Sequence, residues 1–133
     1  AGCRACTDVT GFGLLGHLHE MTLASKVGAR IRFRDVPLID GVKELLRMDM
    51  APGGTYANLD FLHTAGALAW EDNLPEEYQL ALSDAQTAGG LLIAVAPDSV
   101  RMLTDALAAA QVSTAADIGE FISDPEGRIR VEL

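Results

Sequence analysis

Residues 7–17 read Thr7-Asp8-Val9-Thr10-Gly11-Phe12-Gly13-Leu14-Leu15-Gly16-His17, which places a carboxylate, a hydroxyl and glycines directly before a run of apolar residues. The apolar residues recur at spacings of three and four, and this pattern predicts a helix from Phe12 to Ser25. The start of a helix offers unpaired N–H groups and the positive end of its dipole to an anion. The stretch is therefore typical of a phosphate site, in which Asp8 supplies a hard oxygen ligand for a bridging Mg²⁺.

Two other interpretations of this stretch stay open. In the first, Asp8 or Thr10 caps the helix and the glycines only allow close packing. In the second, the three glycines form the G-x-G-x-x-G fingerprint of a Rossmann-type oxidoreductase, because Asp35 follows 19 residues after the last of them. That fingerprint requires a buried strand directly before its first glycine, and residues 6–10 are too polar to form one.

Two further segments combine glycines with polar side chains. Pro52-Gly53-Gly54-Thr55-Tyr56-Ala57-Asn58 precedes a predicted helix, and it suits either an anion site or a turn in which Thr55 is the N-cap. Ser83-Asp84-Ala85-Gln86-Thr87-Ala88-Gly89-Gly90 leads into an apolar run that predicts a buried strand from Leu91 to Ala96. Residues 83–90 are interpreted as an active-site loop or as an unusual connection between a helix and a strand.

The order of the predicted elements indicates an α+β fold, with a mixed or antiparallel sheet covered by helices. Further helices are expected over Asp40–Met48, Tyr56–Leu62, Pro75–Leu82 and Asp98–Ala110, with Asp40 and Asp98 as N-caps. Further strands are expected over Arg30–Val36, Ala65–Trp70, Ala116–Ile122 and Arg128–Glu132. The turn at Asp124–Gly127 predicts that the last two strands form a hairpin.

Composition and charge exclude several classes of protein. The chain has 133 residues, which suits a single domain, and its 49% hydrophobic content argues against disorder. The formal charge of −9 disfavours a nucleic-acid partner, and no apolar run approaches the roughly 20 residues of a membrane span. We expect a cytoplasmic protein, because no signal peptide opens the chain. The first residue is not Met and the densest motif begins at Thr7, so the chain is expected to be a piece of a longer protein.

Neither the cysteines nor the histidines form a convincing metal site. Cys3 and Cys6 have a C-x-x-C spacing, but no second pair completes four zinc ligands, so we expect ordinary thiols and leave redox or metal use open. His17 and His19 are two residues apart in a predicted helix and point to different sides. We therefore expect them at the surface or at the edge of the core.

Taken together, the three glycine-containing segments resemble the C-terminal domain of the selenophosphate synthetase (selenide, water dikinase) family. They occur in the same order as in that family, and the resemblance extends over essentially the whole chain. Two residues depart from the family pattern: Ala85 stands where the family has Pro, and Ala88 stands where it has Ser. The second departure removes a hydroxyl group from the loop.

The resemblance implies the fold of the aminoimidazole-ribonucleotide-synthetase superfamily, in which an N-terminal domain pairs into a homodimer and an α+β domain follows. It implies that residues 1–133 are the second of two domains, and that the whole protein uses ATP and Mg²⁺ to convert selenide to selenophosphate, AMP and orthophosphate. In that family the reactive Cys or selenocysteine lies in the N-terminal part, so no catalytic residue is expected here and this chain alone should be inactive. The resemblance to the family motif implies that Asp8 is a metal ligand.

The remaining expected site residues have less specific roles. Those expected near the phosphates are Thr10, Gly11 and Gly13. Those expected to line the site are Asn58, Gln86 and Thr87. The alternatives are another ATP-dependent kinase or synthetase of the same superfamily, against which residues 12–17 argue, and a non-catalytic assembly domain.

Overall fold

A four-stranded mixed sheet lies at the centre of the structure, a computed structural model that describes residues 2–133. Its strands lie in the order β3 (Leu68–Trp70), β6 (Ile129–Glu132), β2 (Gly28–Arg32) and β5 (Gly119–Ile122). Strand β6 is parallel to both of its neighbours, whereas β5 is antiparallel to β2. The mixed sheet and its helices confirm the predicted α+β class.

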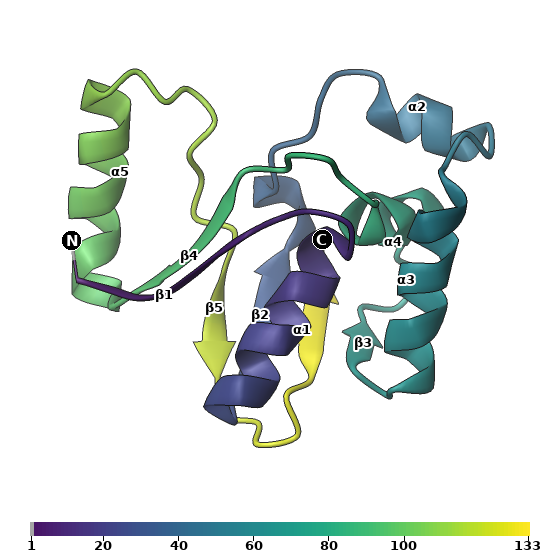
Figure 1. The fold of residues 1–133 in the computed structure, drawn as a ribbon, viewed down its shortest axis with the longest axis horizontal. Helices are drawn as coiled ribbons and strands as arrows, with labels where there is room; N and C mark the ends of the chain where they lie inside the picture. Colours follow the sequence, from purple (N-terminus) through teal and green to yellow (C-terminus); the bar gives the residue numbers. More distant parts are fainter. Residues whose placement is uncertain (1) are drawn as a thin grey trace.

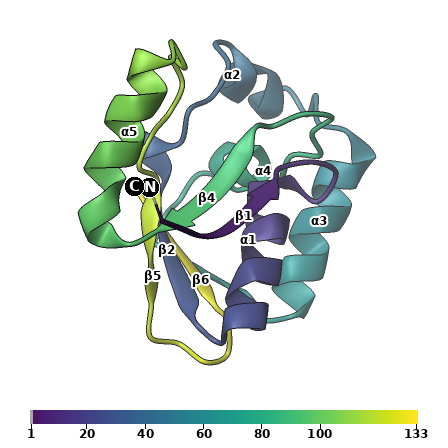
Figure 2. The same ribbon diagram turned by 60° about the vertical axis from the view of Figure 1, so that its left-hand side comes forward.

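A separate two-stranded ribbon pairs β1 (Cys3–Asp8) with β4 (Leu91–Val95) in antiparallel register. Figures 1 and 2 show this ribbon running from the base of α5 (Val100–Ala109) towards the start of α1 (Gly13–Ser25). The ribbon therefore brings two segments that are distant in the sequence to the loop that precedes α1.

Helices α1, α3 (Gly53–Thr64) and α4 (Glu76–Ser83) pack against one another, and α1 also packs on β2 (Figure 1). Helix α2 (Val42–Arg47) packs on α4, and two 3₁₀ turns, η1 (Phe33–Asp35) and η2 (Pro97–Ser99), complete the secondary structure of the described residues. No helix among residues 2–133 has both the length and the apolar character needed to cross a bilayer.

The core lies between the central sheet and these helices, because alternate residues of a strand point to opposite faces. Ile129 and Val131 of β6 are fully buried, as is Leu15 of α1. Arg130, which lies between the two buried residues of β6, is paired in register with Arg30 of β2, and Arg30 forms ion pairs with acidic residues of β5 and β6. One face of the sheet is thus apolar and the other is charged.

The predicted C-terminal hairpin is wrong. Strand β2 lies between β5 and β6, so residues 123–128 cross over one strand instead of joining two neighbours. The central position gives β6 a partner on each side and buries both of its apolar side chains. A turn signal is local, and it carries no information about a third strand that inserts between the two strands that it connects.

The ribbon also differs from the prediction. The apolar run 91–96 predicts a buried strand, but β4 is only half-buried and Leu91 is 67% exposed. Strand β1 has no counterpart among the predicted elements, because its residues are mostly exposed and show no apolar alternation. Both errors have one cause, which is that a two-stranded ribbon lying outside the central sheet need not bury its apolar residues.

The predicted helix caps are also corrected. Helix α2 begins after Gly41 and α5 begins after the η2 turn, and neither helix has a side-chain cap, so Asp40 and Asp98 do not act as N-caps. Helix α1 follows Phe12 without a side-chain cap, so neither Asp8 nor Thr10 caps it. Strand β2 ends at residue 32, earlier than predicted, because the chain turns into η1.

Replacing Ile129 should test the importance of the central strand. Ile129→Ala removes a fully buried side chain, so we expect the free energy of unfolding to fall by about 2–5 kcal/mol. The measurement is urea denaturation of the purified protein. Met102→Ala is the control, because Met102 is 55% exposed and its loss should change stability by no more than about 0.5 kcal/mol. Equal effects of the two variants would contradict the assignment of Ile129 to the core.

The turn before β6 should give a pH-dependent contribution to stability. Arg128 Nε donates to Asp124 Oδ2 across 2.9 Å, and this hydrogen bond lowers the pKa of the Asp124 carboxyl group below its ordinary value. A lowered pKa in the folded state stabilises the protein above about pH 4 and loses that effect as the pH falls. Asp124→Asn should therefore reduce the urea midpoint at pH 7 more than at pH 3. The control is Asp105→Asn on α5, where a highly exposed ion pair with Arg101 should matter little at either pH.

Candidate functional site

Three segments that are distant in sequence meet at the start of α1. Val9 and Thr10 lie beside residues 86–90, because Gly89 N–H donates to the Val9 carbonyl (2.8 Å) and Gln86 N–H donates to the Thr10 carbonyl (3.1 Å). Val9 N–H in turn donates to the carbonyl of Gly90 (2.9 Å). These backbone hydrogen bonds join the first glycine-containing segment, residues 7–17, to the third, residues 83–90.

Asn58 of α3 connects the second glycine-containing segment, residues 52–58, to the other two. Its side-chain Nδ2 donates to the carbonyl of Gly11 (2.8 Å) and to that of Ser83 (3.0 Å). One amide group thus bridges the loop before α1 and the end of α4. Residues 9–13, the start of α3 and residues 83–90 therefore form one hydrogen-bonded unit, which we call the three-segment site.

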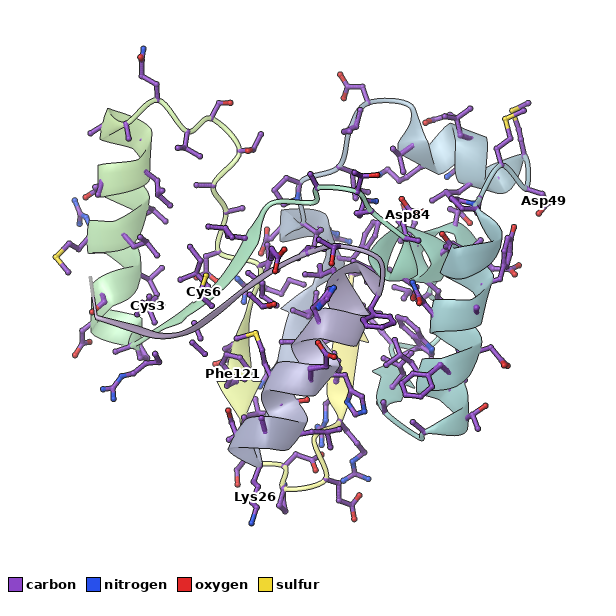
Figure 3. All side chains as sticks on the ribbon, in the orientation of Figure 1. Cys3, Cys6, Lys26, Asp49, Asp84 and Phe121 are labelled. Carbon is purple, nitrogen blue, oxygen red and sulfur yellow. The ribbon has the colours of Figure 1, made fainter. Side chains whose placement is uncertain are left out.

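Asp84 is the central polar side chain of this site, and Figure 3 shows it at the end of α4 near α3. Its Oδ1 accepts a hydrogen bond from the hydroxyl of Thr55 (2.7 Å), and its Oδ2 accepts one from Gln86 Nε2. The Thr55 side chain is fully buried, and its Oγ1 also accepts a hydrogen bond from Ala85 N–H (3.2 Å). The expected role of Thr55 as an N-cap is therefore wrong, because its hydroxyl serves the third segment.

Gly13 allows the first segment to approach α4 closely. Its φ of +69° lies in the left-handed region, and a Cβ atom at this position would lie 2.7 Å from the carbonyl carbon of Ser83. Any side chain would therefore both strain the backbone and push the loop away from α4.

His17 lies directly behind the loop and holds Thr10. The ring is buried, with Nδ1 3.2 Å from Glu20 Oε2 and Nε2 3.1 Å from Thr10 Oγ1. Because a carboxylate can only accept, Nδ1 carries the proton, and Nε2 of a neutral ring accepts from the Thr10 hydroxyl. His19 is also buried, but its contact is with the carbonyl of Gly127, so the two rings do point to different sides as expected.

Asp8 lies at the exposed end of β1, beside the site. Within residues 2–133 its carboxylate forms neither an ion pair nor a hydrogen bond, so both oxygens are available to a cation. The same described residues contain no group of three His, Cys, Asp or Glu side chains arranged to hold a metal ion. Asp8 can therefore contribute one carboxylate ligand to a metal ion.

Comparisons with known proteins identify the family of this chain. Residues 1–132 match the family described as AIR synthase related protein, C-terminal domain. The chain belongs to this family. The related proteins include "Selenide, water dikinase" from Pelobacter propionicus, which is 44% identical over 129 residues (97% of this chain), and the protein of the same name from Shigella flexneri, which is 39% identical over 133 residues (99% of this chain). The match covers 36% of each relative, so the chain spans about a third of their length.

The strand topology of this AIR-synthase-related domain overturns the Rossmann interpretation. A dinucleotide-binding fingerprint joins a buried strand of a parallel sheet to a helix. Here the strand before the glycines is β1, which is mostly exposed and pairs antiparallel with β4. The G-x-G-x-x-G spacing is therefore coincidental, and Gly13 instead serves the approach of the loop to α4.

In this AIR-synthase-related domain, most residues predicted to form the site do meet. The members of the three-segment site among them are Thr10, Gly11, Gly13, Asn58, Gln86 and Thr87, the last of which is exposed. Asp8 is exposed beside the site.

The pattern of the sequence does not reveal the roles of Thr55 and Asp84. Both belong to segments that the glycines single out, but a hydrogen bond between residues 29 positions apart has no local signature. The only indication in the sequence is that Thr55 and Asp84, a hydroxyl and a carboxylate, each lie within a glycine-containing segment.

The cysteines lie on the ribbon, and both are exposed (Figure 3). Three residues of extended strand span about 10 Å, whereas the Cα atoms of a disulfide lie within about 7 Å. Cys3 and Cys6 on β1 are thus poorly placed for an internal disulfide, even with the irregular register between Cys3 and Ala5.

Replacing Gly13 should show whether its close approach to α4 holds the site together. Gly13→Ala should lower the free energy of unfolding by about 1–2 kcal/mol for the left-handed backbone and by about 1–3 kcal/mol more for the collision with Ser83. Gly41→Ala is the matched control, because Gly41 has a φ of +85° but no atom within 4 Å of its Cβ position. Urea denaturation measures both variants, and equal losses would show that the close approach contributes nothing.

Proposed function

We propose that this chain is the C-terminal domain of a selenide, water dikinase. The main support is the convergence of the three glycine-containing segments in one site, in a chain that is 39–44% identical over nearly its whole length to proteins of that name. The whole protein would convert selenide, ATP and water to selenophosphate, AMP and orthophosphate.

In this proposal the chain contributes one wall of a phosphoryl-transfer site. Such reactions depend mainly on positioning and on neutralising phosphate charge, and Mg²⁺ with ATP supplies the transferable phosphoryl groups and that neutralisation when bound. Asp8 fits this role because its carboxylate is exposed and unpaired among residues 2–133. Thr10, held by His17, and Gly11 lie on the same loop and would face the phosphates. Gly13 would support this loop from behind, because it is buried and its N–H donates to the Thr10 carbonyl (3.0 Å).

The rest of the site would come from a preceding N-terminal domain, which we also propose to form the homodimer. One carboxylate is a weak Mg²⁺ site, because the ion binds through few protein ligands and keeps several of its waters. The lack of a three-ligand cluster among the described residues supports this division between domains. We therefore expect the 133-residue chain alone to be inactive. We place the whole protein in the cytoplasm, where exposed thiols such as Cys3 and Cys6 stay reduced.

The test replaces Asp8 in the full-length protein. Asp8→Asn keeps the size of the side chain and removes its charge, so we expect selenide-dependent AMP formation to fall by about 100-fold or more, with an unchanged melting temperature. The control is Asp98→Asn, because Asp98 is exposed in η2, which follows the end of β4 opposite to the three-segment site.

Each other outcome has a clear meaning. AMP formation by the wild type without selenide would replace the proposed substrate and indicate another kinase of the superfamily. Full activity of the Asp8→Asn variant would remove Asp8 from the site while leaving the proposed reaction in place. Failure of the wild type to form AMP under either condition would favour a non-catalytic assembly domain.

A further inference from the structure

Gln86 is a firmly held polar side chain near the exposed edge of the site. Its backbone N–H donates to the carbonyl of Thr10 across 3.1 Å, and its side-chain Nε2 donates to Asp84 Oδ2. The side chain is half-buried. Within residues 2–133 no donor forms a hydrogen bond to the other end of this amide, Oε1, so an acceptor oxygen is left free in a fixed position.

Asp84 determines which end of the Gln86 amide is free. Its other oxygen is already occupied by Thr55, whose side chain is fully buried and cannot turn to solvent. If the Gln86 amide reversed, Oε1 would face a carboxylate oxygen, and two acceptors would oppose each other. Asp84, whose two oxygens both accept hydrogen bonds, therefore keeps Nε2 inward and Oε1 outward.

Asp84 in the site and Asp8 beside it thus have different environments. Both Asp84 oxygens accept hydrogen bonds from protein donors, whereas Asp8 has no side-chain partner among the described residues. Backbone hydrogen bonds between Val9 and Gly89 and between Thr10 and Gln86 hold the segment after Asp8 beside Gln86. The two hydrogen-bonded segments therefore present a charged oxygen ligand, the Asp8 carboxylate, and a neutral acceptor oxygen, Gln86 Oε1.

We propose that Asp84 is a positioning residue, and that the Gln86 Oε1 which it turns outward accepts a hydrogen bond from the water shell of the divalent cation bound by Asp8. This inference rests on the proposed function. A neutral acceptor suits such a cation, because Mg²⁺ keeps several waters whose hydrogens point away from the metal. Asp84 itself touches neither the cation nor the substrate.

The test exchanges the donor and the acceptor in this pair, in the full-length protein. In Asp84→Asn the new amide can still accept from Thr55, but its NH₂ group faces Gln86, so the Gln86 amide reverses and presents Nε2 outward. We expect the affinity for Mn²⁺, used in place of Mg²⁺ with ATP and measured by electron paramagnetic resonance without turnover, to fall about tenfold. The Mg²⁺ concentration for half-maximal activity should rise by a similar factor.

The double variant Asp84→Asn with Gln86→Glu again presents an acceptor oxygen outward at position 86. One oxygen of the new carboxylate at position 86 accepts from the new amide at position 84, and the other oxygen points outward as an acceptor. Mn²⁺ affinity should return to within about threefold of the wild type. The matched control is Gln111→Glu, which makes the same chemical change at an exposed residue shortly after α5 and should leave Mn²⁺ affinity unchanged.

Several results would overturn the inference. Unchanged Mn²⁺ affinity in Asp84→Asn would do so, as would a folded double variant that fails to recover, or a wild type that binds no Mn²⁺. If Asp84→Asn does not fold, Gln86→Ala takes its place and should lower Mn²⁺ affinity about tenfold, because it removes the acceptor itself. The proposed function is tested apart from this, since it depends on selenide-dependent AMP formation by the wild type and not on Mn²⁺ binding by the variants.

Discussion

The hydroxyl of Thr55 donates to Asp84 across 2.7 Å and is fully buried, which joins the first turn of α3 to the residue that follows α4. A buried hydroxyl must have a partner, because leaving it unsatisfied removes the hydrogen bonds that water would supply. This contact fixes the start of the segment 83–90 against α3. Through Gln86 and Gly89, that segment then determines the position of Val9 and Thr10.

The site is supported by the core but is not part of it. Leu15 of α1 and Leu82 of α4 are fully buried in the core, and they fix two of the helices that the segments of the site adjoin. The ribbon of β1 and β4, by contrast, is half-exposed along most of its length. The residues that we propose to meet a ligand or another domain thus lie on the exposed ribbon and its loops, while packing sets the positions of their supporting helices.

Asp84 and Asp8 also differ in their burial and in their hydrogen-bond partners. Asp84 is held by two protein donors and organises its neighbours, whereas Asp8 remains without a side-chain partner among the described residues. An unpaired carboxylate at the edge of a hydrogen-bonded loop is suited to a cation that arrives with its own waters. The overall charge of −9 says nothing about this division, which depends on individual contacts.

Local patterns in the chain were enough to establish the α+β class, the positions of α1, α4 and α5 and the three segments of the site, because helical periodicity and glycine-containing turns are properties of neighbouring residues. They could not establish that β2 lies between β5 and β6, that β4 belongs to an exposed ribbon, or that Thr55 and Asp84 meet. These three features depend on contacts between residues far apart in the chain. Such contacts are selected by the packing of the whole domain, so no short window of residues contains them.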